Sequence, residues 1–171
     1  EAEQILAVVE QFEIDEVLFA DTEEQKNALW KMRRSVAEAV KANSIYKEED
    51  TVVPRYMLPE LLTGIKRIGA KYGFKSVCYG HAGNGNIHVN ILKDNIDEAQ
   101  WHNILKNAVG EIFDEVIRLG GSLSGEHGIG ILNKEFMSKQ FTEVELGLMR
   151  GIKKVFDPKS IMNPGKIFPE Y

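Results

Sequence analysis

The chain has 171 residues, 43% of them hydrophobic and 27% charged, which suits one globular domain with a proper core and excludes disorder. A net charge of −5, without a concentrated run of Lys or Arg, argues against nucleic-acid binding. The single cysteine, Cys78, excludes an intrachain disulfide and favours a reducing, cytoplasmic compartment, and no apolar run approaches the ~20 residues that span a membrane.

The first part of the chain predicts helices alternating with short strands. It opens inside an amphipathic helix, EAEQILAVVEQF, without an initiator Met, so we expect a fragment or a processed product. A strand is expected at 15–20, then a helix at 22–40 that is N-capped by Thr22. The apolar residues of that helix predict one buried stripe: Leu29, Met32, Val36 and Val40. The strand-like TVVP at 51–54 precedes a helix closed by Gly73.

The second part continues this alternation. Strands are expected at 74–81 and 86–92, followed by a long helix over 98–119 that Gly120 and Gly121 end. A short strand should lead into the glycine-rich segment around 124–130. Thr142 and Glu145 match a capping box for a last helix, and an irregular, partly apolar tail follows. The pattern predicts an α+β fold, with helices on one face of a mainly antiparallel sheet.

The segment YGHAGNGNIHVN, at 79–90, holds two histidines in an unusual setting. In NIHVN the apolar and polar residues alternate, which predicts a strand whose polar face carries His88 between two amides. His81 lies seven residues earlier, and this odd spacing in one unbroken strand would put the two rings on opposite faces. The intervening glycines tolerate positive φ, so the chain can turn and bring both imidazoles to one side. The alternative is a β-turn with an incidental histidine at each end.

A second glycine-rich segment, SGEHGIG at 124–130, places Glu126 beside His127. Two histidines and one carboxylate leave an open position on zinc or a similar ion, and His81, His88 and Glu126 make up that set. His127 would then be placed to act as a general base. The alternative for this pair is a solvated turn. His102, in the long helix, is expected at the surface without a role.

Three further residues are candidates for ligand contact. Arg33 lies close after Trp30 and could hold a substrate carboxylate, although a solvated helix face explains it about as well. Arg55 follows Pro54 at a strand end, where it could contact an anion or simply face solvent. Asn163, in the turn MNPGK, is either a turn former or a polar contact to a ligand.

Together these segments resemble a known family. GHAGNGNIH is similar to the pattern G-H-x-G-D-G-N-x-H, GGSLSGEHGIG to G-G-x-x-S-x-E-H-G-x-G, and FDPKSIMNPGKIF to a C-terminal signature. All three stand in the order found in the C-terminal domain of FAD-linked 2-hydroxy-acid oxidases and dehydrogenases, which are vanillyl-alcohol-oxidase-type flavoproteins. That group includes the glycolate oxidase FAD subunit, D-lactate dehydrogenase and D-2-hydroxyglutarate dehydrogenase.

The resemblance implies that residues 1–171 form the cap domain of such an enzyme, with a ferredoxin-like sheet, while a separate N-terminal domain binds FAD. It matches His81, His88 and Glu126 to ligands of a divalent metal, for which we expect zinc. It matches His127 to the base near the flavin, Arg33 to the carboxylate-binding position and Asn163 to a residue that approaches the flavin. The implied partners are a small D-2-hydroxy acid, the FAD-binding domain and an electron-acceptor subunit, through which the protein could associate with a membrane.

One residue departs from the family pattern, and rival interpretations stay open. Asn84 stands where the family usually has Asp, and a weaker orientation of a ligand histidine would follow. The rivals are a stand-alone metal-binding or ligand-sensing module, a flavoprotein of the superfamily with non-redox chemistry, and a purely structural α+β domain. Since none of the 171 residues accepts a hydride, we expect the isolated chain to be inactive as a dehydrogenase.

Overall fold

The computed structural model describes residues 2–14 and 17–169, and the chain divides into two compact units after Ala42. The first unit contains α1 (Ala2–Val9), α2 (Glu23–Arg34) and most of α3 (Val36–Asn43). The capping-box geometry at the start of α2 confirms Thr22 as N-cap, with Gln25 as the reciprocal partner.

Two expectations for this unit were wrong. The predicted helix at 22–40 is divided at Ser35, and its apolar stripe is not buried: Met32 and Val36 are exposed, and Leu29 and Val40 are half-buried. Helical periodicity shows which face is apolar but not what covers it. The expected strand at 15–20 begins at two residues outside the described part, and residues 17–20 have no regular structure.

The second unit is built on a three-stranded antiparallel sheet with the order β1-β3-β2. Its strands are β1 (Tyr46–Val52), β2 (Lys75–His81) and β3 (Asn86–Leu92). The strand predicted at 51–54 was therefore misplaced: pairing with β3 runs from Tyr46 to Val52 and ends before Val53, and the polar run 47–51 carries no apolar alternation that would mark a strand. The strand expected before 124 is reduced to a single antiparallel bridge between Val52 and Ser122.

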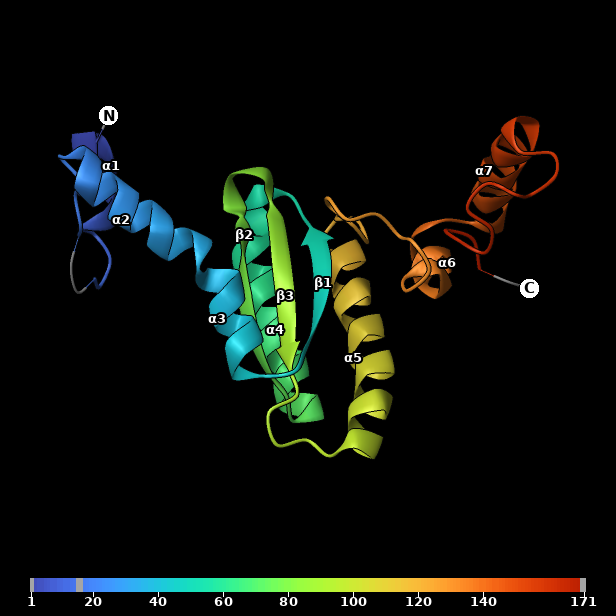
Figure 1. Ribbon diagram of the computed structural model, residues 1–171, viewed down its shortest axis with the longest axis horizontal. Coiled ribbons are helices and arrows are strands. Elements are labelled where there is room, and N and C mark those ends of the chain that lie inside the picture. Colours follow the sequence, from blue (N-terminus) through green and yellow to red (C-terminus); the bar gives the residue numbers. More distant parts are fainter. Residues whose placement is uncertain (1, 15–16, 170–171) are drawn as a thin grey trace. The chain divides into compact units, whose positions relative to one another are not determined.

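Helices α4 (Leu58–Tyr72) and α5 (Glu98–Arg118) complete a ferredoxin-like arrangement of strand, helix, two strands and helix. Figure 1 shows α4 running along the sheet behind β2 and β3, with α5 beside β1. The bridge at Ser122 lies where a fourth strand would extend the sheet beyond β1. The α+β prediction is thus confirmed.

Apolar residues from both helices and from one face of β3 form the core. Gly73, at φ 76°, ends α4 in the left-handed conformation, and Asp97 caps α5 by accepting the N–H of Gln100. The fully buried core side chains include Leu61, Ile65, Val89, Ile91, Ile112, Phe113 and Val116. Each contributes on the order of 1.5–3 kcal/mol by leaving water. The alternation in β3 leaves its opposite face polar, which is the face that carries the candidate site.

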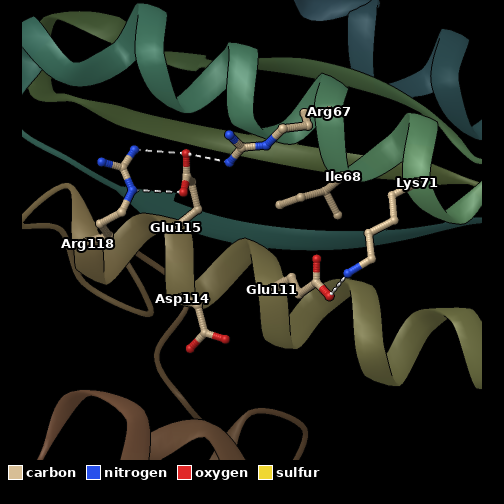
Figure 2. A pocket seen from close by; sticks show the side chains of 7 residues that line it. All are labelled: Arg67, Ile68, Lys71, Glu111, Asp114, Glu115 and Arg118. Carbon is tan, nitrogen blue, oxygen red and sulfur yellow. Dashed lines mark hydrogen bonds and ion pairs between the residues drawn. The ribbon is translucent and has the colours of Figure 1, made fainter.

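The outer seam between α4 and α5 is bridged by ion pairs (Figure 2). The Glu115 carboxylate, almost buried, accepts from Arg118 at 3.0 Å and from Arg67 at 3.3 Å, and Lys71 pairs with Glu111. A Cβ on Gly64 would lie 2.5 Å from the Glu115 carboxylate, so glycine lets the two helices approach here. These charges satisfy one another, and the seam therefore serves packing.

The C-terminal part contains α6 (Met137–Gln140), α7 (Glu143–Phe156) and an irregular tail. The predicted capping box is confirmed at Thr142 and Glu145. Asp157 ends α7, and its carboxylate accepts the N–H groups of Ile161 and Met162 at 2.9 and 3.0 Å, which fixes the start of the tail. In the described part of the chain, no helix is long and apolar enough to cross a membrane.

Candidate metal and substrate site

The hairpin of β2 and β3 brings His81 and His88 to the same face of the sheet. In its register His81 pairs with Asn86, and Tyr79 pairs with His88. Directly paired residues share a face of the sheet, and so do residues two apart in one strand, so His81 and His88 lie on the same face. The turn between the strands closes through Gly85, whose φ is 76° and whose added Cβ would lie 1.9 Å from the Val53 carbonyl oxygen. The predicted role of the glycines in correcting the odd spacing is therefore confirmed.

Strand β1 adds two carboxylates to this polar face. Asp50 is the direct cross-strand partner of His88, and Glu48 lies two residues before it on the same side. The Asp50 Oδ1 and Glu48 Oε1 atoms are 3.9 and 3.7 Å from Nδ1 of His88. Asn86, also on this face, donates its side-chain amide to Asp50 Oδ1 at 2.6 Å. The buried face is thus both polar and acidic.

Asp50 holds the second glycine-rich segment in place. Its Oδ2 atom accepts three successive backbone N–H groups, those of Gly125, Glu126 and His127, at 3.0, 2.6 and 2.7 Å. It also accepts the Ser124 hydroxyl at 3.0 Å. Burial alone would raise the pKa of Asp50, but these donors outweigh it and lower the pKa to about 2. A carboxylate that is ionised at neutral pH therefore anchors the loop that carries Glu126 and His127.

This anchor brings Glu126 between the two histidines of the hairpin. Glu126 Oε1 is 3.8 Å from His81 Nε2, and Oε2 is 3.7 Å from His88 Nε2. One ligand atom from each of the three residues lies within 4.8 Å of the others. A tetrahedral zinc with bonds of about 2.0–2.1 Å keeps its ligand atoms about 3.3 Å apart, so small side-chain movements would close the site.

His127 lies on the other side of His88. The two rings are nearly parallel, with centroids 5.1 Å apart and 24° between their planes. Nδ1 of His127 is 3.8 Å from Glu48 Oε1, the same oxygen that faces Nδ1 of His88. The side chain of His127 is 53% exposed, which leaves its ring open to a group supplied from outside the chain.

The donor set fits a divalent cation. His88 is 9% exposed, and its buried Nδ1 has no hydrogen-bond partner among the described residues. That nitrogen faces Glu48 and Asp50, whereas the atom that His88 offers to the set with His81 and Glu126 is Nε2. Two imidazoles and one carboxylate are the ligands that catalytic zinc commonly uses with one position left open. The predicted ligands are thus brought together, and their metal binding stays a prediction.

The other predicted contact residues belong to other elements than this cluster does. Arg33 belongs to the first unit, where its guanidinium lies 5.5 Å from the centre of the Trp30 ring. Arg55 is exposed in the 3₁₀ turn Arg55–Met57, which contacts the turn after His81, so it shares that end of the sheet. Asn163 is exposed in the tail and accepts from Lys166 at 2.9 Å. The roles of these three residues stay predictions.

Sequence reasoning missed Asp50 and Glu48. Both lie in the part of β1 that was not predicted as a strand, so their alternation was not interpreted as a face. The run KEEDTV gave no local signal, since its three consecutive acids do not alternate with apolar residues as a half-buried strand would. His102 was predicted correctly as a surface residue; it is 73% exposed and pairs only with Glu98 in the described residues.

The fold is an α+β domain, and the polar face of its sheet carries two imidazoles and a carboxylate of the kind that bind divalent metals. Residues 1–167 match the family "FAD linked oxidases, C-terminal domain", and the chain belongs to that family. It is 34% identical over 166 residues to a D-lactate dehydrogenase of Anaerostipes hadrus, covering 96% of this chain and 35% of that protein.

Two further relatives have related names. The chain is 36% identical over 171 residues to glycolate oxidase subunit GlcD of Bacillus subtilis, covering 97% of this chain and 35% of the relative. It is 36% identical over 174 residues to a D-2-hydroxyglutarate dehydrogenase of Stutzerimonas stutzeri, covering 98% and 37%. The chain therefore spans about a third of the length of the curated relatives that it matches.

Proposed function

We propose that this chain is the substrate- and metal-binding part of an FAD-dependent oxidoreductase that converts a D-2-hydroxy acid to the 2-oxo acid. The observation that carries the proposal is the convergence of His81, His88 and Glu126. The names of the relatives support the substrate class of glycolate, D-lactate or D-2-hydroxyglutarate. The remaining length of those relatives supports a separate FAD-binding region, with which this chain would form the enzyme.

The proposed chemistry divides between this chain and its cofactors. His81, His88 and Glu126 would hold a divalent cation, zinc by its donor set, which supplies Lewis acidity toward the substrate hydroxyl. FAD, when bound, supplies the two-electron acceptor. Both residues expected near the flavin, His127 and Asn163, have exposed side chains, which fits a cofactor held mainly by another part of the enzyme.

The side chains of this chain would bind the acid and move one proton. A guanidinium, Arg33 or Arg55, would bind the substrate carboxylate by two parallel hydrogen bonds. His127 would accept the hydroxyl proton on Nε2, since Nδ1 faces Glu48 at 3.8 Å. The Glu48 carboxylate would favour a proton on Nδ1 and so leave Nε2 free as the base. Without a hydride acceptor of its own, the isolated chain should not turn over D-lactate or glycolate.

A zinc-content measurement tests this proposal. The purified chain and its His88→Ala and His102→Ala variants are loaded with zinc, dialysed and compared by elemental analysis. We expect zinc in the wild type and in His102→Ala but not in His88→Ala, because only His88 belongs to the cluster. Equal zinc in all three proteins, or none in the folded wild type, would contradict the site assignment.

A further inference from the structure

The Nδ1 side of His88 faces a second set of possible ligands. One ligand atom from each of Glu48, His88 and His127 lies within 4.8 Å of the others, and Glu48 Oε1 faces Nδ1 of both rings. This set uses the ring nitrogen of His88 that points away from Glu126, since Nε2 is the atom 3.7 Å from the Glu126 carboxylate. His88 therefore separates two donor sets, one on each of its nitrogens.

We propose that Glu48, His88 and His127 form a second divalent-cation position that shares His88 with the first. The second position rests on the proposed function in one respect: it assumes that His81, His88 and Glu126 form the first cation position. Its support is local: Glu48 Oε1 is 3.7 Å from His88 Nδ1 and 3.8 Å from His127 Nδ1, and the two rings are nearly parallel. Both rings thus present the same nitrogen to one carboxylate oxygen.

The buried Nδ1 of His88 gives an independent reason for a ligand here. His88 is about nine-tenths buried, and this atom has no hydrogen-bond partner in the described part of the chain. Asp50 Oδ1, 3.9 Å away, is occupied by the Asn86 amide, so Asp50 contributes negative charge rather than a ligand. A cation between Glu48 and the two rings would satisfy Nδ1 and balance that charge.

Occupation of the second position has a chemical consequence. For His88 to bind one cation through Nε2 and another through Nδ1, the ring would have to release its last proton to solvent. The second cation would be the weaker one, because it adds positive charge beside the first. It would also fix the proton of His127 on Nε2 and so remove the proposed base. Excess zinc should then inhibit an enzyme that one equivalent of zinc supports.

Isothermal titration of the chain with zinc tests the second position without any activity measurement. We expect about two equivalents for the wild type, with the second at least about tenfold weaker. Glu48→Gln and His127→Gln should each retain about one equivalent and lose the weaker step. Glu24→Gln and His102→Ala are the matched controls, and both should retain the wild-type stoichiometry. Circular dichroism establishes that each variant is folded.

The outcomes separate this inference from the proposed function. A single equivalent that His81→Ala abolishes and Glu48→Gln leaves intact would overturn the second position and support the first. A single equivalent that Glu48→Gln abolishes and His81→Ala leaves intact would support the Glu48 position and overturn the first. Two equivalents that persist in both Glu48→Gln and His127→Gln, or no binding by the wild type, would overturn the second position.

Discussion

At the scale of single residues, Asp50 organises the site although it need not touch a substrate. Its carboxylate accepts three consecutive backbone N–H groups and a hydroxyl from the loop that presents Glu126 and His127. A loop of this glycine content has a large conformational entropy to lose, and charged hydrogen bonds offset that loss. The position of Glu126, the third proposed ligand, therefore depends on Asp50, which is far from it in the sequence.

Replacement of Asp50 by Asn should loosen that loop. The amide has no negative charge, and its NH2 group would oppose the backbone N–H donors if it faced them. We therefore expect the free energy of unfolding to fall by about 1.5–3 kcal/mol. Urea denaturation measures the change. The control is Asp114→Asn on α5, whose exposed carboxylate pairs with Lys139 and should contribute about 0–1 kcal/mol. An Asp50 effect no larger than that of Asp114 would show that the loop is held by other contacts.

At the scale of elements, the hairpin geometry decides whether the two histidines meet. The four residues between His81 and Asn86 return the chain so that alternate positions of β2 and β3 share a face. Gly85 allows this in two ways: it adopts a positive φ, and it leaves room for the Val53 carbonyl. The convergence of His81 and His88 therefore depends on a turn in which only glycine fits at position 85.

Two glycine substitutions separate these two contributions. Gly73 and Gly85 both have φ 76°, but an added Cβ at Gly73 meets nothing within 4 Å. Gly73→Ala should therefore show only the cost of the left-handed conformation, about 1–2 kcal/mol, and Gly85→Ala should exceed it because of the clash. Denaturant unfolding of both variants gives the comparison. If the Gly85 variant were as stable as the Gly73 variant, the close approach to Val53 would be refuted.

Elements were predictable where local signals were strong. The caps at Thr22, Gly73 and Thr142 marked helix ends, and the alternation in NIHVN marked β3, because these patterns reflect hydrogen bonding and pleat within a few residues. Strand β1 was misplaced because its polar face is satisfied by residues far along the chain, notably the loop at 124–127. Three proposed ligands were therefore visible in the sequence, while the carboxylates that support them were not.

At the scale of the whole molecule, α7 presents an apolar surface to solvent. Val144, Leu148, Ile152 and Val155 follow helical spacing and are all more than 60% exposed, whereas Leu146, on a different side of the helix, is fully buried. Exposed apolar surfaces of this kind commonly mark interfaces. We therefore expect the stripe to promote self-association of the chain when it is studied alone.

Polar substitution of the stripe should relieve self-association without loss of stability. Leu148→Glu with Ile152→Lys should lower the tendency of the isolated chain to associate and leave its melting temperature nearly unchanged. Leu146→Ala, the buried control, should cost about 2–5 kcal/mol. Sedimentation velocity and thermal unfolding report the two effects. A stripe variant as destabilised as Leu146→Ala would mean that the stripe packs within this chain.

Zinc X-ray absorption of the chain loaded with one equivalent tests the central claim most directly. We predict a first shell of two imidazole nitrogens and carboxylate or water oxygen at about 2.0–2.2 Å. The imidazole signal should fall by half in His81→Ala and should remain unchanged in His102→Ala. A shell without imidazole, or a spectrum that His81→Ala does not alter, would contradict the site that His81, His88 and Glu126 are proposed to form.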